Sequence, residues 1–355
     1  MYTRLLSAPG EQSFFLLGRR GVGKTAWLRV ALPDALYVEL LDHHEYSRLL
    51  AAPESLADRI PADHRDWVVL DEIQRVPELL NEVHRLIESK RLKFALTGSS
   101  ARKLRRRGVN LLAGRALTRH MFPLTAAELA TDFNLERALT HGTLPLAWTG
   151  DDPTAYLKSY VTTYLREEVQ QEGFARNLAA FARFLEAASF SQGGVLNMAA
   201  VARECAVKAK VVEDYFSILE DLLIAFRLPV FTRRARRRMV SHPKFYISDP
   251  GVFRAIRPRG PLDSTSEIHG AALETLVLQE LRAHNEYRGL GYELHYWRTQ
   301  TGDEVDFVLY GERGLHAIEV KMSDRVRPDD LASLLRFQED YPKCTARLLH
   351  LGSRR

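Results

Sequence analysis

A glycine-rich turn between an apolar run and a helical pattern constrains this chain more than any other feature. The segment FFLLGRRGVGKTAWLRVAL has the spacing G-x-x-x-x-G-K-T, formed by Gly18, Gly21, Gly23, Lys24 and Thr25. Glycines let backbone amides surround a phosphate without a Cβ clash, and the start of a following helix adds positive potential. The pattern therefore predicts a strand, a phosphate-binding loop and a helix, with Lys24 on the terminal phosphates of ATP and Thr25 on Mg²⁺.

Two acids follow a second apolar run, in DWVVLDEIQRVP. Asp71 and Glu72 come where this strand is expected to end, and open α/β sheets bind ligands at the carboxyl ends of their strands. Asp71 is predicted to hold the magnesium shell, and Glu72 to orient the water that attacks the γ-phosphate. A third run, LKFALTGSS, ends in Thr97, Ser99 and Ser100, any of which could contact that phosphate or water.

Short apolar runs alternate with helical periodicity in the first third of the chain. The runs SFFLLG, ALYVELL, DWVVLDE and LKFALTGSS are typical of a parallel α/β sheet. A helical region is predicted over residues 124–192. The last hundred residues return to strands and helices, beginning with the run KFYISD, and are expected to form a second α/β unit.

The glycine loop, the paired acids and the third strand together resemble the AAA-type ATPases of the additional-strand P-loop class. The later segment LLAGRALTRHMFPLTAAELA is similar to a stretch of one subgroup in which an arginine follows a glycine. By that resemblance Arg115 is a candidate arginine finger, which would reach the ATP of a neighbouring subunit and imply a homo-oligomer, for example a ring. The alternative is an Arg115 that pairs with a local acid.

A helix-turn-helix pattern follows, with helices expected over residues 198–205 and 208–222 and a strand after them. Such a pair can serve packing alone. Two arginine clusters, RKLRRR at 102–107 and RRARRR at 233–238, hold much of the basic charge, and the second lies where the wing of a winged helix would reach DNA. We expect contacts to the DNA backbone, strong salt dependence and no assignable base contact.

Three charges interrupt two apolar strands near the C-terminus, in the segment TGDEVDFVLYGERGLHAIEVKMS. Glu319 and Lys321 share one face of their strand, because side chains alternate along a strand. If the two strands are neighbours, Asp306 and Glu319 can converge on one Mg²⁺ or Mn²⁺ with Lys321 beside them. The preceding helix offers Glu274 and Glu280 as a further ligand, and helical periodicity does not choose between them.

The order helix, strand, strand, helix with these acids resembles the restriction-endonuclease-like PD-(D/E)xK nuclease core. The whole arrangement is similar to a group of uncharacterised prokaryotic AAA-type ATPases that carry a winged helix and such a C-terminal domain. In that group the first helix starts with a glycine and, four residues later, a glutamate, which favours Glu274 as the metal ligand. This chain departs from the pattern at Thr275, where the group has asparagine, and at Val305, where the nuclease motif has proline.

Composition and length agree with a soluble chain of several domains. With 355 residues, 46% hydrophobic and 27% charged, it exceeds the usual size of one domain and contains no long apolar segment. Its start lacks the features of a secretory signal, so we expect a cytoplasmic protein without membrane contact. The expected domains are an AAA-type ATPase core at 1–122, a helical lid at 123–155, a winged helix at 156–240 and a nuclease-like domain at 241–355.

The sequence thus predicts an enzyme that hydrolyses ATP and processes DNA, coupled to a metal-dependent endonuclease site, with branched or junction DNA as one expected substrate. The alternative is a nucleotide-switched regulator that binds DNA or a protein through an inactive nuclease fold.

Overall fold

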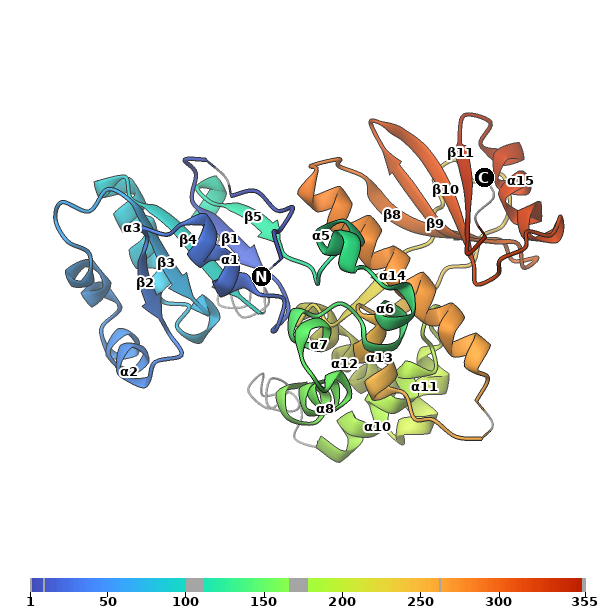
Figure 1. The fold of residues 1–355 in the computed structure, drawn as a ribbon, viewed down its shortest axis with the longest axis horizontal. Helices are drawn as coiled ribbons and strands as arrows, with labels where there is room; N and C mark the ends of the chain where they lie inside the picture. Colours follow the sequence, from blue (N-terminus) through green and yellow to red (C-terminus); the bar gives the residue numbers. More distant parts are fainter. Residues whose placement is uncertain (1, 9, 100–111, 166–177, 262, 353–355) are drawn as a thin grey trace. The chain divides into compact units, whose positions relative to one another are not determined.

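The computed structural model describes residues 2–8, 10–99, 112–165, 178–261 and 263–352 (Figure 1). Contacts divide the chain into two compact units, which are described one at a time. The first comprises Met1–Leu124 with Asp221–Leu223, and the second comprises Thr125–Glu220 with Ile224–Arg355. The boundaries expected near residues 155 and 240 both fall inside the second unit.

The first unit is built on a five-stranded parallel sheet in the order β2-β3-β4-β1-β5. Its strands are β1 (Phe14–Leu17), β2 (Leu36–Glu39), β3 (Trp67–Asp71), β4 (Lys93–Gly98) and β5 (Leu117–His120). The connecting helices are α1 (Lys24–Ala31), α2 (His43–Ala51) and α3 (Leu79–Lys90), with short 3-10 helices at Pro53–Arg59, Ile73–Arg75 and Leu112–Gly114.

The central strands read as unbroken apolar runs because they are buried on both faces. Every residue of β1 and β3 is buried, and the side chains on one face, Phe15, Leu17, Val68 and Leu70, pack with those of α3 in one core. The four expected strands and the parallel α/β sheet are confirmed. The strand β5 was not predicted, because LTRH is polar and half exposed at the edge of the sheet.

The second unit begins with a helical region, as expected. Its described helices up to residue 221 are α5 (Ala126–Leu129), a 3-10 helix (Ala130–Asp132), α6 (Leu135–His141), α7 (Pro145–Thr149), α8 (Pro153–Ser159), a π-helix (Tyr160–Leu165), α10 (Leu178–Ser189), α11 (Met198–Cys205) and α12 (Ala209–Asp221). The pair α11 and α12 confirms the two expected helices. They are joined through Ala206, whose φ of 53° is left-handed and turns the chain sharply.

A two-stranded antiparallel sheet follows, formed by β6 (Ala225–Leu228) and β7 (Lys244–Ile247). The long connection between these strands leaves them and packs against the C-terminal region. Phe231 is buried there in a core with Trp297 and Phe337, and Met239 packs against the same core. The arginine cluster at 233–238 therefore lies on a segment held by the C-terminal domain.

The C-terminal region contains a four-stranded sheet in the order β11-β10-β9-β8. Its strands are β8 (Glu293–Arg298), β9 (Glu304–Gly311), β10 (Gly314–Lys321) and β11 (Thr345–His350), and its helices are α13 (Pro250–Ile256), α14 (Thr265–Tyr287) and α15 (Asp329–Asp340). Strands β8, β9 and β10 are antiparallel neighbours, whereas β11 runs parallel to β10.

The expected order helix, strand, strand, helix is incomplete, since β8 precedes the two predicted strands and β11 follows the last helix. Both additional strands lie at edges of the sheet, and β8 has only two buried residues, Tyr296 and Trp297. In β11 exposed and half-buried residues alternate, so no apolar run marks it in the sequence.

Candidate functional site

The phosphate-binding loop adopts a backbone that requires glycine. Gly21 and Gly23 have φ angles of 85° and 91°, in the left-handed region that other residues rarely occupy. A Cβ atom on Gly18 would lie 2.6 Å from the backbone oxygen of Met121, so a side chain there would displace the neighbouring chain. The loop thus connects β1 to α1 through glycines at positions where a side chain would be strained or would clash.

Lys24 and Thr25 begin α1, directly after this loop. The Lys24 ammonium is buried and donates to the backbone oxygens of Gly18 at 2.6 Å and Arg19 at 3.5 Å. The Thr25 hydroxyl donates to Oδ2 of Asp71 at 2.8 Å. A threonine hydroxyl at the start of α1 and a carboxylate at the carboxyl end of β3 are thereby adjacent.

Asp71 and Glu72 are held by the end of the neighbouring strand β4. The Thr97 hydroxyl donates to Oδ1 of Asp71 and accepts the Glu72 backbone N–H at 3.0 Å. Glu72 has a φ of 61°, which is unfavourable for a residue with a side chain. Strained backbone of this kind is concentrated at functional sites, where surrounding contacts maintain it.

Gln74 is a site residue that the sequence reading missed. Its side-chain amide donates to Oε2 of Glu72 and, at 3.0 Å, to Oγ of Ser99. Gln74 therefore connects the predicted water-orienting acid to the predicted phosphate contact. Its position two residues after Glu72 was the only signal in the sequence. Ser100 and the arginine cluster at 102–107 lie outside the described residues.

The residues at this loop fit a magnesium nucleotide. Left-handed glycines and a helix start provide a cradle for phosphates, while Lys24, Thr25 and Asp71 supply a cation and the oxygen donors that Mg²⁺ prefers.

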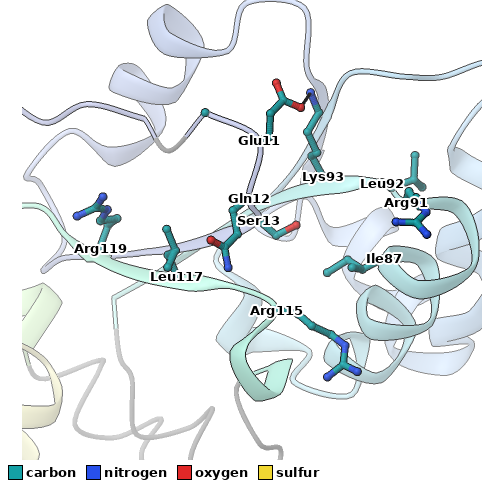
Figure 2. Close-up of a pocket in the computed structure, with 11 residues that line it drawn as sticks. Glu11, Gln12, Ser13, Ile87, Arg91, Leu92, Lys93, Arg115, Leu117 and Arg119 are labelled. Carbon is teal, nitrogen blue, oxygen red and sulfur yellow. Dashed lines mark hydrogen bonds and ion pairs between the residues drawn. The ribbon is translucent and has the colours of Figure 1, made fainter.

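Arg115 lies at the opposite end of the same sheet. It lines a hollow of about 600 Å³ at the amino ends of β1, β4 and β5, together with Arg91, Lys93 and Arg119 (Figure 2). Its Nε is paired with Oε1 of Glu88 on α3. The phosphate loop leaves the carboxyl end of β1, so Arg115 is remote from the loop of its own chain. A finger role would require the nucleotide of another subunit, and it remains a prediction.

The C-terminal acids gather around a lysine that the sequence reading did not single out. Lys244, the first residue of β7, has a side chain only 2% exposed. Its Nζ lies 2.5 Å from Oε1 of Glu304, 3.2 Å from Oδ1 of Asp306 and 3.9 Å from Oε2 of Glu274. Burial lowers the pKa of Lys244, but the surrounding acidic groups outweigh it and hold that pKa well above its usual value.

The remaining predicted residues, Glu319 and Lys321, lie on β10, next to the strand β9 that carries Asp306. Asp306 Oδ2 accepts the backbone N–H of Val320 at 2.9 Å, which ties β9 to β10. Lys321 donates to Oε1 of Glu319 at 2.7 Å. Burial, reinforced by Asp306, raises the pKa of Glu319 to about 7. Burial and Asp306 likewise raise the pKa of Glu274, to about 8.

The structure separates the two candidate glutamates of α14. Glu274 accepts a hydrogen bond from the Tyr246 hydroxyl at 3.1 Å and faces Lys244. Glu280 instead accepts the backbone N–H of Ala126 at 2.8 Å, at the start of α5. Of the two, only Glu274 therefore joins the acid cluster.

Thr275, where the chain departs from the related group, has a structural role. Its hydroxyl donates to the Ala271 oxygen at 2.6 Å and accepts from the Gln192 side chain at 2.6 Å.

A divalent metal does not fit the acid cluster as it is folded. Among the residues that the structure describes, no group of three or more His, Cys, Asp or Glu side chains is arranged to hold a metal ion. The Lys244 ammonium lies among the acids, where a metal ion would have to bind, and it forms ion pairs with Glu304 and Asp306. The predicted ligands Glu274, Asp306 and Glu319 thus share a neighbourhood without forming a metal site.

The arginine cluster at 233–238 is partly neutralised. Arg233 pairs with Glu293 at 2.7 Å, and Arg237 pairs with Glu339 at 2.9 Å and with Asp340 at 3.0 Å. The other three arginines, Arg234, Arg236 and Arg238, are exposed. They are the part of the cluster that remains available for phosphate groups.

Comparison with protein families identifies the first unit. Residues 10–130 match the model of an AAA domain. The first unit is therefore similar to an AAA domain. Residues 132–263 match a domain of unknown function (DUF8612), and residues 269–355 match another (DUF4143). The limits of these matches place the α11 and α12 helices and β7 in one domain, and α14 with the four-stranded sheet in the next.

Two curated relatives are similar over 262 residues at 26% identity: the uncharacterised proteins Mb2031c of Mycobacterium bovis and Rv2008c of Mycobacterium tuberculosis. Each match covers 72% of this chain and 58% of the relative, so the chain spans little more than half of their length.

Two solved structures are similar at low scores. The Orc1 protein of Aeropyrum pernix, solved in complex with DNA, is 17% identical with a TM-score of 0.30, covering 70% of this chain and 87% of that one. Protein VC1899 of Vibrio cholerae is 13% identical with a TM-score of 0.22, covering 97% and 90%. Within the described part of the chain, no helix is both long and apolar enough to cross a membrane.

Proposed function

We propose that this protein hydrolyses ATP with Mg²⁺ and uses the nucleotide cycle to control its binding to DNA. The observation that carries the proposal is the contact of Thr25 with Asp71 at 2.8 Å, beside Lys24 at the start of α1. A magnesium-binding hydroxyl, its acidic partner and a phosphate-binding lysine are thus adjacent at the carboxyl edge of a parallel sheet.

Each residue at the nucleotide site has a proposed role. Lys24 binds the terminal phosphates, and Thr25 and Asp71 hold the magnesium ion, which neutralises phosphate charge when bound. Glu72 orients the attacking water and draws its proton. Gln74 positions Glu72 and Ser99, to which it donates hydrogen bonds.

DNA binding is proposed for the second unit. Its support is the turn-linked pair α11 and α12, together with the exposed arginines Arg234, Arg236 and Arg238. Exposed arginines bind backbone phosphates irrespective of sequence, so we expect affinity that falls steeply with salt.

We do not include DNA cleavage in the proposed function, because the C-terminal acids surround Lys244 rather than a space for a metal. This favours the alternative drawn from the sequence, a nucleotide-dependent DNA-binding protein with a nuclease-like domain. Metal-dependent cleavage is the competing prediction. It would appear as cutting of linear, single-stranded or junction DNA with Mg²⁺ or Mn²⁺ that disappears in Asp306→Ala, and we expect no such activity.

The nucleotide half of the proposal is tested with Glu72→Gln. We expect this variant to bind ATP like the parent but to hydrolyse it at least about 100-fold more slowly, since a lost general base typically has this effect. Steady-state phosphate release and binding of a fluorescent ATP analogue measure the two quantities. Glu54→Gln, at an exposed position of the same unit, serves as the control. Hydrolysis by Glu72→Gln at the parent rate would remove Glu72 from its proposed role.

A further inference from the structure

Lys244 is an ammonium group buried between strands and a helix of the second unit. Its neighbours come from three elements: Tyr246 lies two residues along β7, Glu274 is on α14, and Glu304 and Asp306 are on β9. The Nζ also lies 5.7 Å from the ring centre of Tyr296 on β8. A lysine at such depth is strongly unfavourable unless carboxylates compensate its charge.

The charges around this ammonium balance without a further cation. Oε1 of Glu304 lies 2.5 Å from Nζ of Lys244, and its Oε2 lies 2.8 Å from a guanidinium nitrogen of Arg298. Asp306 accepts a hydrogen bond from Nζ of Lys244 at Oδ1, at 3.2 Å, and one from the backbone N–H of Val320 at Oδ2, at 2.9 Å. Two basic groups thus face two carboxylates, all four of whose oxygens are engaged.

These engaged oxygens leave little for a divalent ion. Mg²⁺ and Ca²⁺ require about six oxygen donors at roughly 2.0–2.6 Å. Beyond the oxygens of Glu304 and Asp306, Oε1 of Glu319 accepts from Lys321 at 2.7 Å while its Oε2 is buried without a hydrogen-bond partner, and Oε2 of Glu274 accepts from the Tyr246 hydroxyl. With Lys244 in place, the unpartnered Oε2 of Glu319 falls far short of the six oxygen donors that such an ion requires.

We propose that Lys244 is the resident cation of the C-terminal acid cluster, and that this domain folds and acts without a bound divalent metal. Lys244 acts here as a positioning residue, which holds β7 against α14 and β9. The inference concerns the second unit and does not depend on ATP hydrolysis by the first.

The test is a titration of the full chain with Mn²⁺ in the absence of nucleotide, followed by the electron paramagnetic resonance signal of free Mn²⁺. Mn²⁺ binding that the change Asp306→Asn abolishes is assigned to the acid cluster. We expect the parent protein to show no Mn²⁺ binding of this kind. We expect Lys244→Met to gain one saturable site, because Asp306 then loses its cationic partner and Oε1 of Glu304 is released. We expect the added change Asp306→Asn to abolish that site again.

Lys321→Met is the matched control, because it removes a neighbouring lysine whose side chain is 36% exposed and contacts Glu319 instead. It should gain no site. Saturable Mn²⁺ binding by the parent that Asp306→Asn abolishes would overturn the proposal, and so would a folded Lys244→Met protein that gains no site.

If Lys244→Met does not fold with its carboxylates uncompensated, the triple variant Lys244→Met, Glu304→Gln, Asp306→Asn should restore folding, measured by circular dichroism and thermal melting. Failure of this neutralised variant to fold would contradict the charge-compensating role. Phosphate release measured on the same samples keeps a failure of the ATPase proposal separate from a failure of this one.

Discussion

At the scale of single residues, Glu274 and Glu280 show how one helix gives two buried glutamates different surroundings. Both lie on α14, six positions apart, and both have raised pKa values. Glu274 faces an ammonium and a carboxylate, whereas Glu280 faces the first backbone N–H of α5. Helical periodicity does not distinguish the two glutamates, because it describes α14 alone. Their different surroundings come from the elements that pack against α14.

Glu280 should make the stability of the protein depend on pH. Burial raises its pKa from the ordinary 4.5 to about 7. The folded state therefore holds this proton more tightly than the unfolded state, and the stabilisation present below the unfolded pKa is lost as pH rises through the folded pKa. Glu280→Gln does not titrate but keeps an acceptor for Ala126. As the pH rises from about 5 to about 8, the free energy of unfolding of this variant should increase relative to that of the parent by on the order of 1–3 kcal/mol.

Urea unfolding at several pH values measures this difference. Glu312→Gln, at an exposed turn position, should follow the parent at every pH. A constant difference between Glu280→Gln and the parent from acid to alkaline pH would contradict a raised pKa at Glu280.

At the scale of elements, the sequence predicted those whose burial leaves a continuous or periodic apolar pattern. The strands β1, β3 and β4 are almost wholly buried, and the helix α12 has a clear apolar face, so their patterns are explicit. The edge strands β5, β8 and β11 carry no such pattern, since half of each is exposed or polar. Their pairing is decided by the neighbouring strand, which local periodicity does not contain.

The segment between β6 and β7 gives the element-scale prediction. Its exposed arginines Arg234, Arg236 and Arg238 should contribute about 0.9 each to the slope of log affinity against log salt, if each binds one phosphate. The triple alanine variant should therefore flatten that slope by about 2–3 and weaken binding at low salt. Fluorescence anisotropy with labelled duplex DNA across a salt series measures both.

The control is the double variant Arg233→Ala, Arg237→Ala, because the guanidinium groups of Arg233 and Arg237 already contact acids. This pair should change the salt slope much less than the triple variant. Equal effects of the two variants, or no effect of the triple variant, would exclude this segment from the DNA contact.

At the scale of the whole molecule, the chain separates nucleotide chemistry from its other charged sites. Every residue proposed to bind ATP lies in the first unit, and the acid cluster and the arginine segment both lie in the second. The role of Lys244 could not be predicted from the sequence, because it meets Asp306 across 62 positions of the chain. Local motifs identified Glu274, Asp306 and Glu319, whereas only the fold identified Lys244 and its partner Glu304.

Arg115 gives the prediction that requires more than one molecule. It lies at the end of the sheet remote from its own phosphate loop, paired with Glu88. If it acts on the nucleotide of a neighbouring subunit, Arg115→Ala should lower ATP hydrolysis at least about tenfold. Glu88→Gln, which only releases the arginine, should retain activity and serves as the control.

Mixing two inactive variants tests whether the arginine acts between subunits. Arg115→Ala retains Glu72, and Glu72→Gln retains Arg115, so a mixed assembly contains one complete site in which the two residues come from different chains. We expect the mixture to hydrolyse ATP faster than either variant alone, with a gain that rises with total protein concentration because assembly is required. Rates that only average those of the two variants, together with parental activity of Arg115→Ala, would instead make the Glu88 pair a local surface contact.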